Sequence, residues 1–354
     1  MLKLFLAIGA CFALTLTTSA QGKAVFIELP SGTLPRDISA NSMVVGELMS
    51  GGGFYWLPTK GVIYIGGQEG EAVSLNGDTI AGTAYDARRT TQAAIWQRAA
   101  EWRLLGLIVP NAAPCDALLS STFDMSEDGK VIVGLAWNTC SIARAFRWEE
   151  STGMVDLGTL SPPLSTRANG ISGDGRIIVG WQDTTFGRRG ARWVDGKQEL
   201  FTGPSGIIGE AHAANRDGSI VVGQSCEFAG RENPFANQQA WIWNQRDGIT
   251  CLQPPRVRVL DNFIGTALAT SEDGRIVGGS HSFGLEAESV LWIDREPIYL
   301  KDYLRANGVP NAFENWVNTG FITGVSRDGR LLIGNGAGPR NFQGFIVILP
   351  EDVK

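Results

Sequence analysis

Histidine is scarce in this sequence of 354 residues, which contains only His212 and His281. A catalytic zinc ion takes three or four converging protein ligands, and no Cys-x-x-Cys or Cys/His cluster supplies them. Neither a Gly-x-Ser-x-Gly nor a phosphate-binding P-loop motif occurs. We therefore expect no metal, no cofactor and no histidine-based catalytic site.

Positive charge is also in short supply. The chain has 30 Lys and Arg against 36 Asp and Glu, so its net charge is −6, which argues against a nucleic-acid-binding surface. Charged residues make up 19%, too few for a coiled coil, and hydrophobic residues make up 44%, too many for a disordered chain. These fractions predict a globular protein.

Long hydrophobic runs are absent except at the N-terminus. Residues 4–16 carry no charge, follow Lys3 and precede the small residues 17–20. This order is typical of a cleaved secretory signal peptide, and the run is shorter than the roughly 20 residues of a membrane span. We predict a signal peptide at 1–20 and one mature domain at 21–354, without a transmembrane segment, in the periplasm or outside the cell. An uncleaved anchor or lipidation at Cys11 are the alternatives.

Four cysteines remain after the signal peptide, and they fall into two pairs whose members are 25 residues apart: Cys115 with Cys140, and Cys226 with Cys251. An even number of cysteines in an exported chain favours disulfides, and we predict these two. Sequence alone permits three pairings, and buried free thiols are the alternative.

A short phrase recurs seven times: an apolar residue, Ser or Asn, any residue, Asp or a similar polar residue, Gly, then an apolar run that ends in Gly. The Ser or Asn positions are 39, 74, 126, 172, 215, 271 and 326. Asp-Gly between two apolar runs predicts a hairpin, because Gly accepts a positive φ and Ser and Asp side chains bond the turn backbone. The predicted turn residues are Ser126, Asp128, Gly129, Ser172, Asp174, Gly175, Asp217, Gly218, Ser271, Asp273, Gly274, Ser326, Asp328 and Gly329. Each turn offers a single Asp, so we favour turn capping over calcium binding.

Each repeat continues with a third run that usually carries Trp and then a fourth run. Four short strands in about 48 residues are typical of a propeller blade, so we predict an all-β, seven-bladed β-propeller over residues 25–349. The seventh repeat has only three runs, and residues 25–29 read as its missing outer strand. We expect this N-terminal strand to close the last blade and cover its edge. Residues 301–308 break the pattern and predict a short helix that ends at Gly308.

The residue two places before each Ser or Asn is small in five of the seven repeats, as crowding near a propeller axis requires. Asp37 and Asp124 are the exceptions. They could face the channel as a carboxylate pair for acid/base chemistry, but we favour solvated or Arg-paired side chains. We assign the third-strand Trp residues to the core between blades rather than to a ligand.

These phrases resemble the HAF repeat family of exported bacterial proteins. The resemblance rests on residues 145–148, residues 155–160, the Ser-x-Asp-Gly phrases and the closing segment from Leu304 to Gly334. It covers most of residues 25–349 and implies an exported, propeller-like repeat protein. The family supplies no activity that could be carried over to this chain.

Three function classes remain open from the sequence. We favour a non-enzymatic, monomeric binding module whose protein or glycan partner lies in the envelope or outside the cell. A periplasmic or secreted glycan hydrolase or lyase is the alternative, and a structural envelope protein is the third class. The irregular segments 183–189, 227–238 and 336–341 are the candidate partner-binding loops, because rigid strands that present variable loops are suited to recognition.

Overall fold

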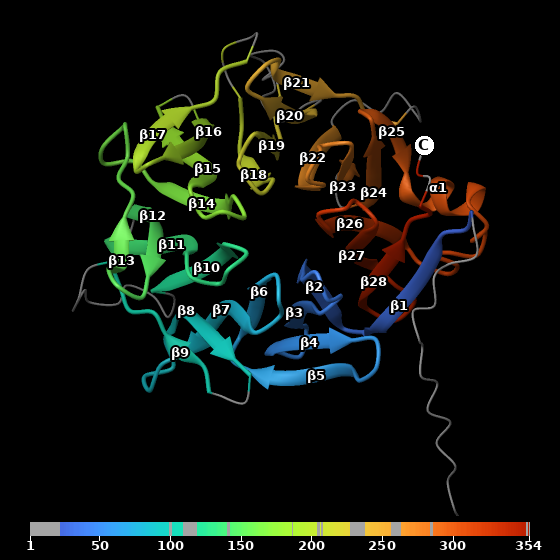
Figure 1. Ribbon diagram of the computed structural model, residues 1–354, viewed down its shortest axis with the longest axis horizontal. Helices are drawn as coiled ribbons and strands as arrows, with labels where there is room; N and C mark the ends of the chain where they lie inside the picture. Colours follow the sequence, from blue (N-terminus) through green and yellow to red (C-terminus); the bar gives the residue numbers. More distant parts are fainter. Residues whose placement is uncertain are drawn as a thin grey trace, which may run out of the picture.

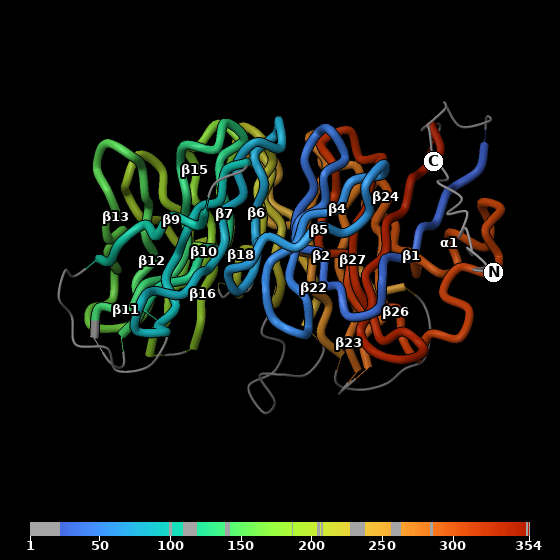
Figure 2. The backbone as a smooth tube through the Cα atoms, turned by 90° about the horizontal axis from the view of Figure 1, so that it is seen from below, coloured from blue at the N-terminus to red at the C-terminus, as the bar shows by residue number. Residues whose placement is uncertain are grey.

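The computed structural model describes residues 22–98, 101–108, 119–139, 142–185, 187–203, 206, 208–226, 238–255, 263–283, 286–351 and 353. Seven four-stranded antiparallel sheets stand around a central axis (Figure 1). Seen from the side, the ring is a disc with the strands running between its two faces (Figure 2). The predicted seven-bladed β-propeller is confirmed.

The blades follow the chain in order, and the strands of each are given from the axis outward. Blades one to four contain β2 (Thr33–Ile38), β3 (Val44–Leu48), β4 (Gly53–Leu57) and β5 (Gly61–Gly66); β6 (Glu69–Val73), β7 (Thr79–Tyr85), β8 (Thr91–Gln97) and β9 (Arg103–Leu104); β10 (Ser120–Met125), β11 (Ile132–Thr139), β12 (Ile142–Glu149) and β13 (Gly153–Asp156); β14 (Thr166–Ile171), β15 (Ile177–Thr184), β16 (Gly187–Val194) and β17 (Lys197–Leu200). Blades five to seven contain β18 (Ala211–Ala214), β19 (Ile220–Gly223), β20 (Ala240–Asn244) and β21 (Gly248–Leu252); β22 (Phe263–Thr270), β23 (Ile276–Phe283), β24 (Glu286–Ile293) and β25 (Glu296–Tyr299); β26 (Asn318–Val325), β27 (Leu331–Ala337), β28 (Phe342–Ile348) and β1 (Val25–Ser31).

The N-terminal strand closes the ring. β1 pairs antiparallel with β28, with Val25 opposite Ile348, and so becomes the outer strand of blade seven (Figure 1). Leu29 of β1 is buried against Ile346 of β28. The sheet edge of β28 is therefore covered by a strand from the other end of the chain, as predicted.

A β-bulge recurs at the same place in all seven inner strands. In blade one, Pro35 pairs with Gly46 and Asp37 with Val45, so Arg36 is an extra residue opposite the second strand. The same one-residue shift occurs in β6, β10, β14, β18, β22 and β26. A bulge bends its strand and leaves one residue out of the ladder, which here lies beside the axis.

The bulge explains the glycine that ends each repeat phrase. A Cβ atom on Gly180 of β15 would lie 2.0 Å from the carbonyl oxygen of Arg167 on the inner strand. Gly134 and Gly334 would meet the corresponding inner-strand carbonyls at 2.0 and 2.1 Å. Only glycine permits this close backbone approach.

The predicted turn chemistry is present. The Ser126 hydroxyl donates to Asp128 Oδ1 at 2.7 Å and accepts from Val131 N–H at 3.0 Å, while Gly129 has a φ of 73°. Equivalent side-chain pairs occur in three further copies, namely Ser172 with Asp174, Ser271 with Asp273 and Ser326 with Asp328. In the fifth blade Asn215 replaces Ser, Asp217 caps Ser219 N–H, and Gly218 has a φ of 70°.

The third-strand Trp residues lie in the core, as predicted. Trp193 is 1% exposed, and its indole N–H donates to the Leu157 carbonyl of the preceding blade at 3.1 Å. Trp292 donates in the same way to the Gln253 carbonyl at 2.8 Å. Small inner-strand residues are also explained, because a Cβ on Gly170 would lie 2.6 Å from the His212 carbonyl of the next blade.

The predicted helix is α1 (Leu300–Ala306), which buries Leu300, Tyr303 and Leu304 against blades six and seven. Asn307 caps its C-terminus, and Gly308 follows with a φ of 86°. Within the described ranges, no helix has the length and apolarity needed to span a bilayer.

Candidate functional site

The central channel holds a cavity of about 1110 Å³, lined by the seven inner strands. Its wall contains three complete rings that each take one residue from every blade. The bulge ring is Arg36, Glu71, Phe123, Asn169, His212, Leu268 and Thr323. The amide ring, named for its backbone N–H groups, is Ile38, Val73, Met125, Ile171, Ala214, Thr270 and Val325. The turn ring is Ala40, Leu75, Glu127, Gly173, Arg216, Glu272 and Arg327, the variable residues of the repeated phrase.

The two ends of the channel open on different faces of the disc. We call the face that carries the Ser-x-Asp-Gly turns the turn face. The opposite face, where inner strands begin and where second and third strands connect, is the loop face. Segments 183–189 and 336–341 belong to these connections, so both lie on the loop face. The third candidate loop, 227–238, lies outside the described residues except for Gln238.

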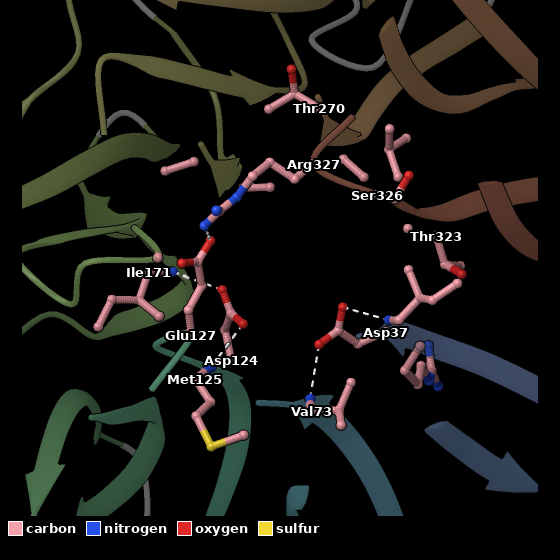
Figure 3. A pocket seen from close by; sticks show the side chains of 18 of the residues that line it. Asp37, Val73, Asp124, Met125, Glu127, Ile171, Thr270, Thr323, Ser326 and Arg327 are labelled. Carbon is pink, nitrogen blue, oxygen red and sulfur yellow. Dashed lines mark hydrogen bonds and ion pairs between the residues drawn. The ribbon is translucent and has the colours of Figure 1, made fainter. Parts of the chain in front are cut away.

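Asp37 and Asp124 do face the channel, but the expectation of solvated or Arg-paired side chains is wrong: both carboxyls are buried, and neither forms an ion pair with an Arg of the described ranges. Asp37 accepts hydrogen bonds from Ile38 N–H at 2.7 Å and from Val73 N–H of the next blade at 2.8 Å (Figure 3). Asp124 makes the same two contacts with Met125 N–H at 2.7 Å and Ile171 N–H at 2.8 Å. Each carboxylate thus links two neighbouring inner strands, a structural role that we had not predicted.

Burial raises the pKa of both carboxyl groups. Desolvation raises the pKa of Asp37 to about 6, against the opposing effect of its two backbone N–H donors. Desolvation, with a smaller contribution from the charge of Asp37, raises the pKa of Asp124 to about 7. The two groups therefore interact across the channel.

Ion pairs cross the turn-face end of the channel. Arg327 of blade seven bonds Glu127 of blade three, which lies across the opening in Figure 3. Glu127 also pairs with Arg216 at 3.4 Å, and Glu272 pairs with Arg327 at 3.9 Å. Backbone bonds join the same turns, including Leu75 N–H to the Glu127 carbonyl at 2.8 Å and Glu127 N–H to the Gly173 carbonyl at 3.0 Å. These contacts narrow and stiffen this end.

An acidic cluster lies on the loop-face side of blades one and two. Arg36 pairs with Glu47 at 2.5 Å and with Glu71 at 3.5 Å. Burial raises the pKa of Glu71 to about 8, because the favourable charge of Arg36 is offset by Glu69 and Glu47. Burial also raises the pKa of Glu69. The cluster therefore retains a proton near neutral pH.

Arginine and aromatic side chains form the opposite side of this mouth, in blades three to five. The guanidinium of Arg188 lies 3.7 Å from the ring centre of Trp181, and that of Arg167 lies 4.7 Å from Phe123. Glu210 accepts from Arg188 at 2.6 Å and from Arg167 at 3.2 Å. Stacking on rings and pairing with one buried carboxylate hold both cations in place.

The two histidines do not form a site together. His212 belongs to the bulge ring, and burial lowers its pKa although Glu210 opposes the shift. His281 lies in β23 between Phe263 and Phe283, and burial lowers its pKa to about 4. In the part of the chain that the structure describes, no three His, Cys, Asp or Glu side chains converge as metal ligands.

One of the predicted disulfides is present. Cys226 and Cys251 are bonded, with a Cα–Cα distance of 5.5 Å and a sequence separation of 25. The bond joins Cys226, which follows the second strand β19 of blade five, to Cys251 in the outer strand β21 of the same blade. Cys115 and Cys140 lie outside the described residues.

The sequence interpretation overlooked the rings and the arginine-aromatic mouth. The turn ring occupies the position treated as any residue, although a hairpin tip on the innermost strand must lie close to the axis. Its charges, at Glu127, Arg216, Glu272 and Arg327, could have indicated it. Nothing in the sequence indicated the bulge, because an extra residue in every repeat leaves the repeat pattern unchanged.

Neither a family model nor a curated protein sequence matches the chain, whereas many solved structures do. An oligogalacturonate lyase in complex with manganese is 10% identical, with a TM-score of 0.54 over 94% of this chain and 99% of that one. The propeller domain of Cps50 (Swd1) from Myceliophteria thermophila is 13% identical, with a TM-score of 0.53 over 92% and 99%. The propeller domain of the trilobed protease from Pyrococcus furiosus is 11% identical, with a TM-score of 0.51 over 92% and 95%. These likenesses show the propeller scaffold alone.

Proposed function

We propose that this protein is an exported, non-enzymatic binding propeller that recognises a protein or glycan partner at the loop-face mouth of its channel. The observation that carries the proposal is the pair of stacked cations at that mouth. Arg167 and Arg188 are fixed on aromatic rings by Glu210, and Arg188 keeps 44% of its side chain exposed. A fixed and exposed guanidinium beside aromatic rings suits hydroxyl-rich or acidic surfaces.

The proposed recognition surface includes a segment that we singled out from the sequence. Asp183 and Arg188 both belong to segment 183–189 and pair with each other at 3.2 Å. The acidic cluster around Arg36 lies on the same face, on the other side of the opening. A partner that meets this mouth would therefore contact donors on one side and acceptors on the other.

Export is proposed from two features. Residues 1–20 have the order of a signal peptide, and they lie outside the described residues. The Cys226–Cys251 disulfide is compatible with an oxidising compartment. We also propose that the chain belongs with the HAF repeat proteins, on the strength of the repeated phrases alone.

A glycan array tests the proposal with a matched pair of variants. Arg188→Ser removes the exposed cation at the mouth. Arg192→Ser is the control, because Arg192 lies in the same strand, pairs with Glu199 and stacks 4.6 Å from the ring of Trp243. We expect at least about tenfold weaker binding for Arg188→Ser and no change for Arg192→Ser, given the usual contribution of a central Arg. Equal binding by both variants and the parent would contradict the proposal.

The alternative glycan hydrolase or lyase makes a different prediction for the channel carboxylates. If the purified protein cleaves glycans and Asp124→Asn abolishes that activity, the enzymatic function is correct and the binding module is wrong. The hydrogen bonds that Asp37 and Asp124 already make to four backbone N–H groups support the binding module instead.

A further inference from the structure

Every inner strand directs one backbone N–H into the channel. In each blade the Ser or Asn N–H donates across the hairpin, as Asn215 N–H does to the Ile220 carbonyl at 3.0 Å and Ser271 N–H does to Ile276 at 2.8 Å. In an antiparallel ladder the preceding residue then points its N–H away from its partner strand. These preceding residues are the amide ring, so seven N–H groups surround the axis.

The protein's own carboxylates occupy four of these seven donors. Asp37 bridges the N–H groups of Ile38 and Val73 in blades one and two. Asp124 bridges those of Met125 and Ile171 in blades three and four. The same arrangement, in which one carboxylate accepts from the N–H groups of two adjacent blades, therefore occurs twice (Figure 3).

Blades five, six and seven present the same donors without a carboxylate. The residues equivalent to Asp37 and Asp124 are Ala213, Ala269 and Gly324, which leave open space beside the N–H groups of Ala214, Thr270 and Val325. Among the described residues, no side chain or backbone carbonyl outside the strand ladders accepts from these three N–H groups. Because these donors face the cavity and bond no group of the described chain, an acceptor in the channel, either water or a ligand, completes them.

Side chains of both charges lie near the three donors, so the open N–H groups themselves are what call for an acceptor. Arg216 and Arg327 of the turn ring follow Ala214 and Val325 by two residues, and both pair with Glu127. The acidic residues Glu272, Asp273 and Asp328 line the cavity from blades six and seven. The hydroxyls of Thr270 and Thr323 line the same wall, but they already donate to the carbonyls of Ser271 at 3.2 Å and Pro35 at 2.9 Å. The acidic side chains Asp37, Asp124 and Glu127 come from blades one and three (Figure 3). We call the side of blades five to seven, with its three open N–H groups, the donor wall, and the side with Asp37 and Asp124 the acidic wall.

We propose that the donor wall of blades five to seven binds the carboxylate of a small organic acid, which spans two adjacent N–H groups as Asp37 and Asp124 do. The carboxylate lies beside Ala213 or Ala269, and the rest of the acid extends toward the acidic wall and the loop-face mouth. This inference rests on the proposed use of the channel for binding and names the ligand group that the channel takes.

Acetate, the smallest suitable probe, tests the site on the full mature chain. We expect acetate to shift the amide resonances of Ala214, Thr270 and Val325 saturably at neutral pH, with sodium chloride balancing the ionic strength. The amides of Ile38, Val73, Met125 and Ile171 should move little, because Asp37 and Asp124 already occupy them. The inference is overturned if the three amides do not move, if all seven move equally, or if chloride alone gives the same shifts.

A pair of identical substitutions provides a second readout that needs no ligand. Ala269→Asp places a carboxylate beside the donors of Thr270 and Val325, so we expect the midpoint of thermal unfolding to rise and the acetate shifts to disappear. Ala72→Asp places the same group where the donors of Val73 and Met125 are already taken, so we expect that midpoint to fall. A change of the same sign in both variants would overturn the inference. The two proposals can also fail separately. If acetate still shifts the three amides but Arg188→Ser does not weaken partner binding, only the proposed recognition at the mouth is wrong.

Discussion

Replacing Asp124 by Asn removes one titrating carboxyl from the channel and leaves a side chain of the same shape. The reference pKa of this carboxyl is 3.8, and burial beside Asp37 raises it to about 7 in the fold. The folded state therefore binds the proton more tightly than the unfolded state. The resulting stability is fully present below pH 3.8 and is lost as the pH rises through about 7.

The magnitude follows from the two pKa values. Between about pH 5.5 and about pH 8, Asp124 contributes about 2 kcal/mol to the pH dependence of the free energy of unfolding. Asp37, with a pKa raised to about 6 by burial, contributes about 1 kcal/mol over the same interval. Glu71, whose pKa is raised to about 8, adds to the dependence of the parent protein and is unchanged in either variant.

Urea unfolding measures this contribution. The free energy of unfolding is determined at both pH values for each protein, and its change with pH is then compared between the parent and the variant. We expect the parent protein to gain more stability on acidification than Asp124→Asn does, by about 2 kcal/mol, and more than Asp37→Asn does, by about 1 kcal/mol. Because each protein is compared with itself at two pH values, any destabilisation by the Asn side chain that does not depend on pH cancels. If Asp124→Asn and the parent gain the same stability, the carboxyl is not desolvated as described, and the reasoning is wrong.

Three further predictions concern the scaffold. Gly180→Ala should lower the free energy of unfolding by about 3 kcal/mol, because its Cβ would meet the Arg167 carbonyl, and an unchanged urea midpoint would contradict the bulge argument. Reducing Cys226–Cys251 should cost about 3 kcal/mol for a separation of 25 residues, as measured by unfolding with and without dithiothreitol, whereas a Cys226→Ser/Cys251→Ser double variant should show no effect of the reductant. Deleting residues 22–31 removes β1 and exposes β28, so the truncated protein should melt well below the full chain or aggregate; equal melting temperatures would mean that β1 does not close the ring.

The blade count, the strand order and the closure by β1 could be predicted because each depends on local signals. Asp-Gly turns such as that at Asp128 and Gly129 fix the hairpins, and the third-strand Trp193 marks the contact between blades. The seventh repeat lacks a fourth run, and residues 25–29 form a run that belongs to no repeat, so the second can be assigned as the missing strand of the first. These features need no knowledge of which side chains meet across the ring.

The channel could not be predicted in the same way, because its contacts join residues far apart in the sequence. Arg327 meets Glu127 although 200 positions separate them. Asp37 and Asp124 were identified as exceptions to a small-residue pattern, but their partners are backbone N–H groups, which no residue type reveals. The stacking of Arg188 on Trp181 likewise depends on the register of one hairpin.

The recurring bulge has a consequence for how the channel wall can vary between blades. The bulge residue belongs to no ladder pair, so no residue of the second strand stands in register opposite it. In this chain the seven positions hold seven different amino acids: Arg36, Glu71, Phe123, Asn169, His212, Leu268 and Thr323. The blades repeat one framework, while this single layer carries a different chemical group at each step around the axis. A substitution there can alter the chemistry of the channel wall with little effect on the sheets, so the wall and the stability of the ring can evolve at separate positions of the same repeat.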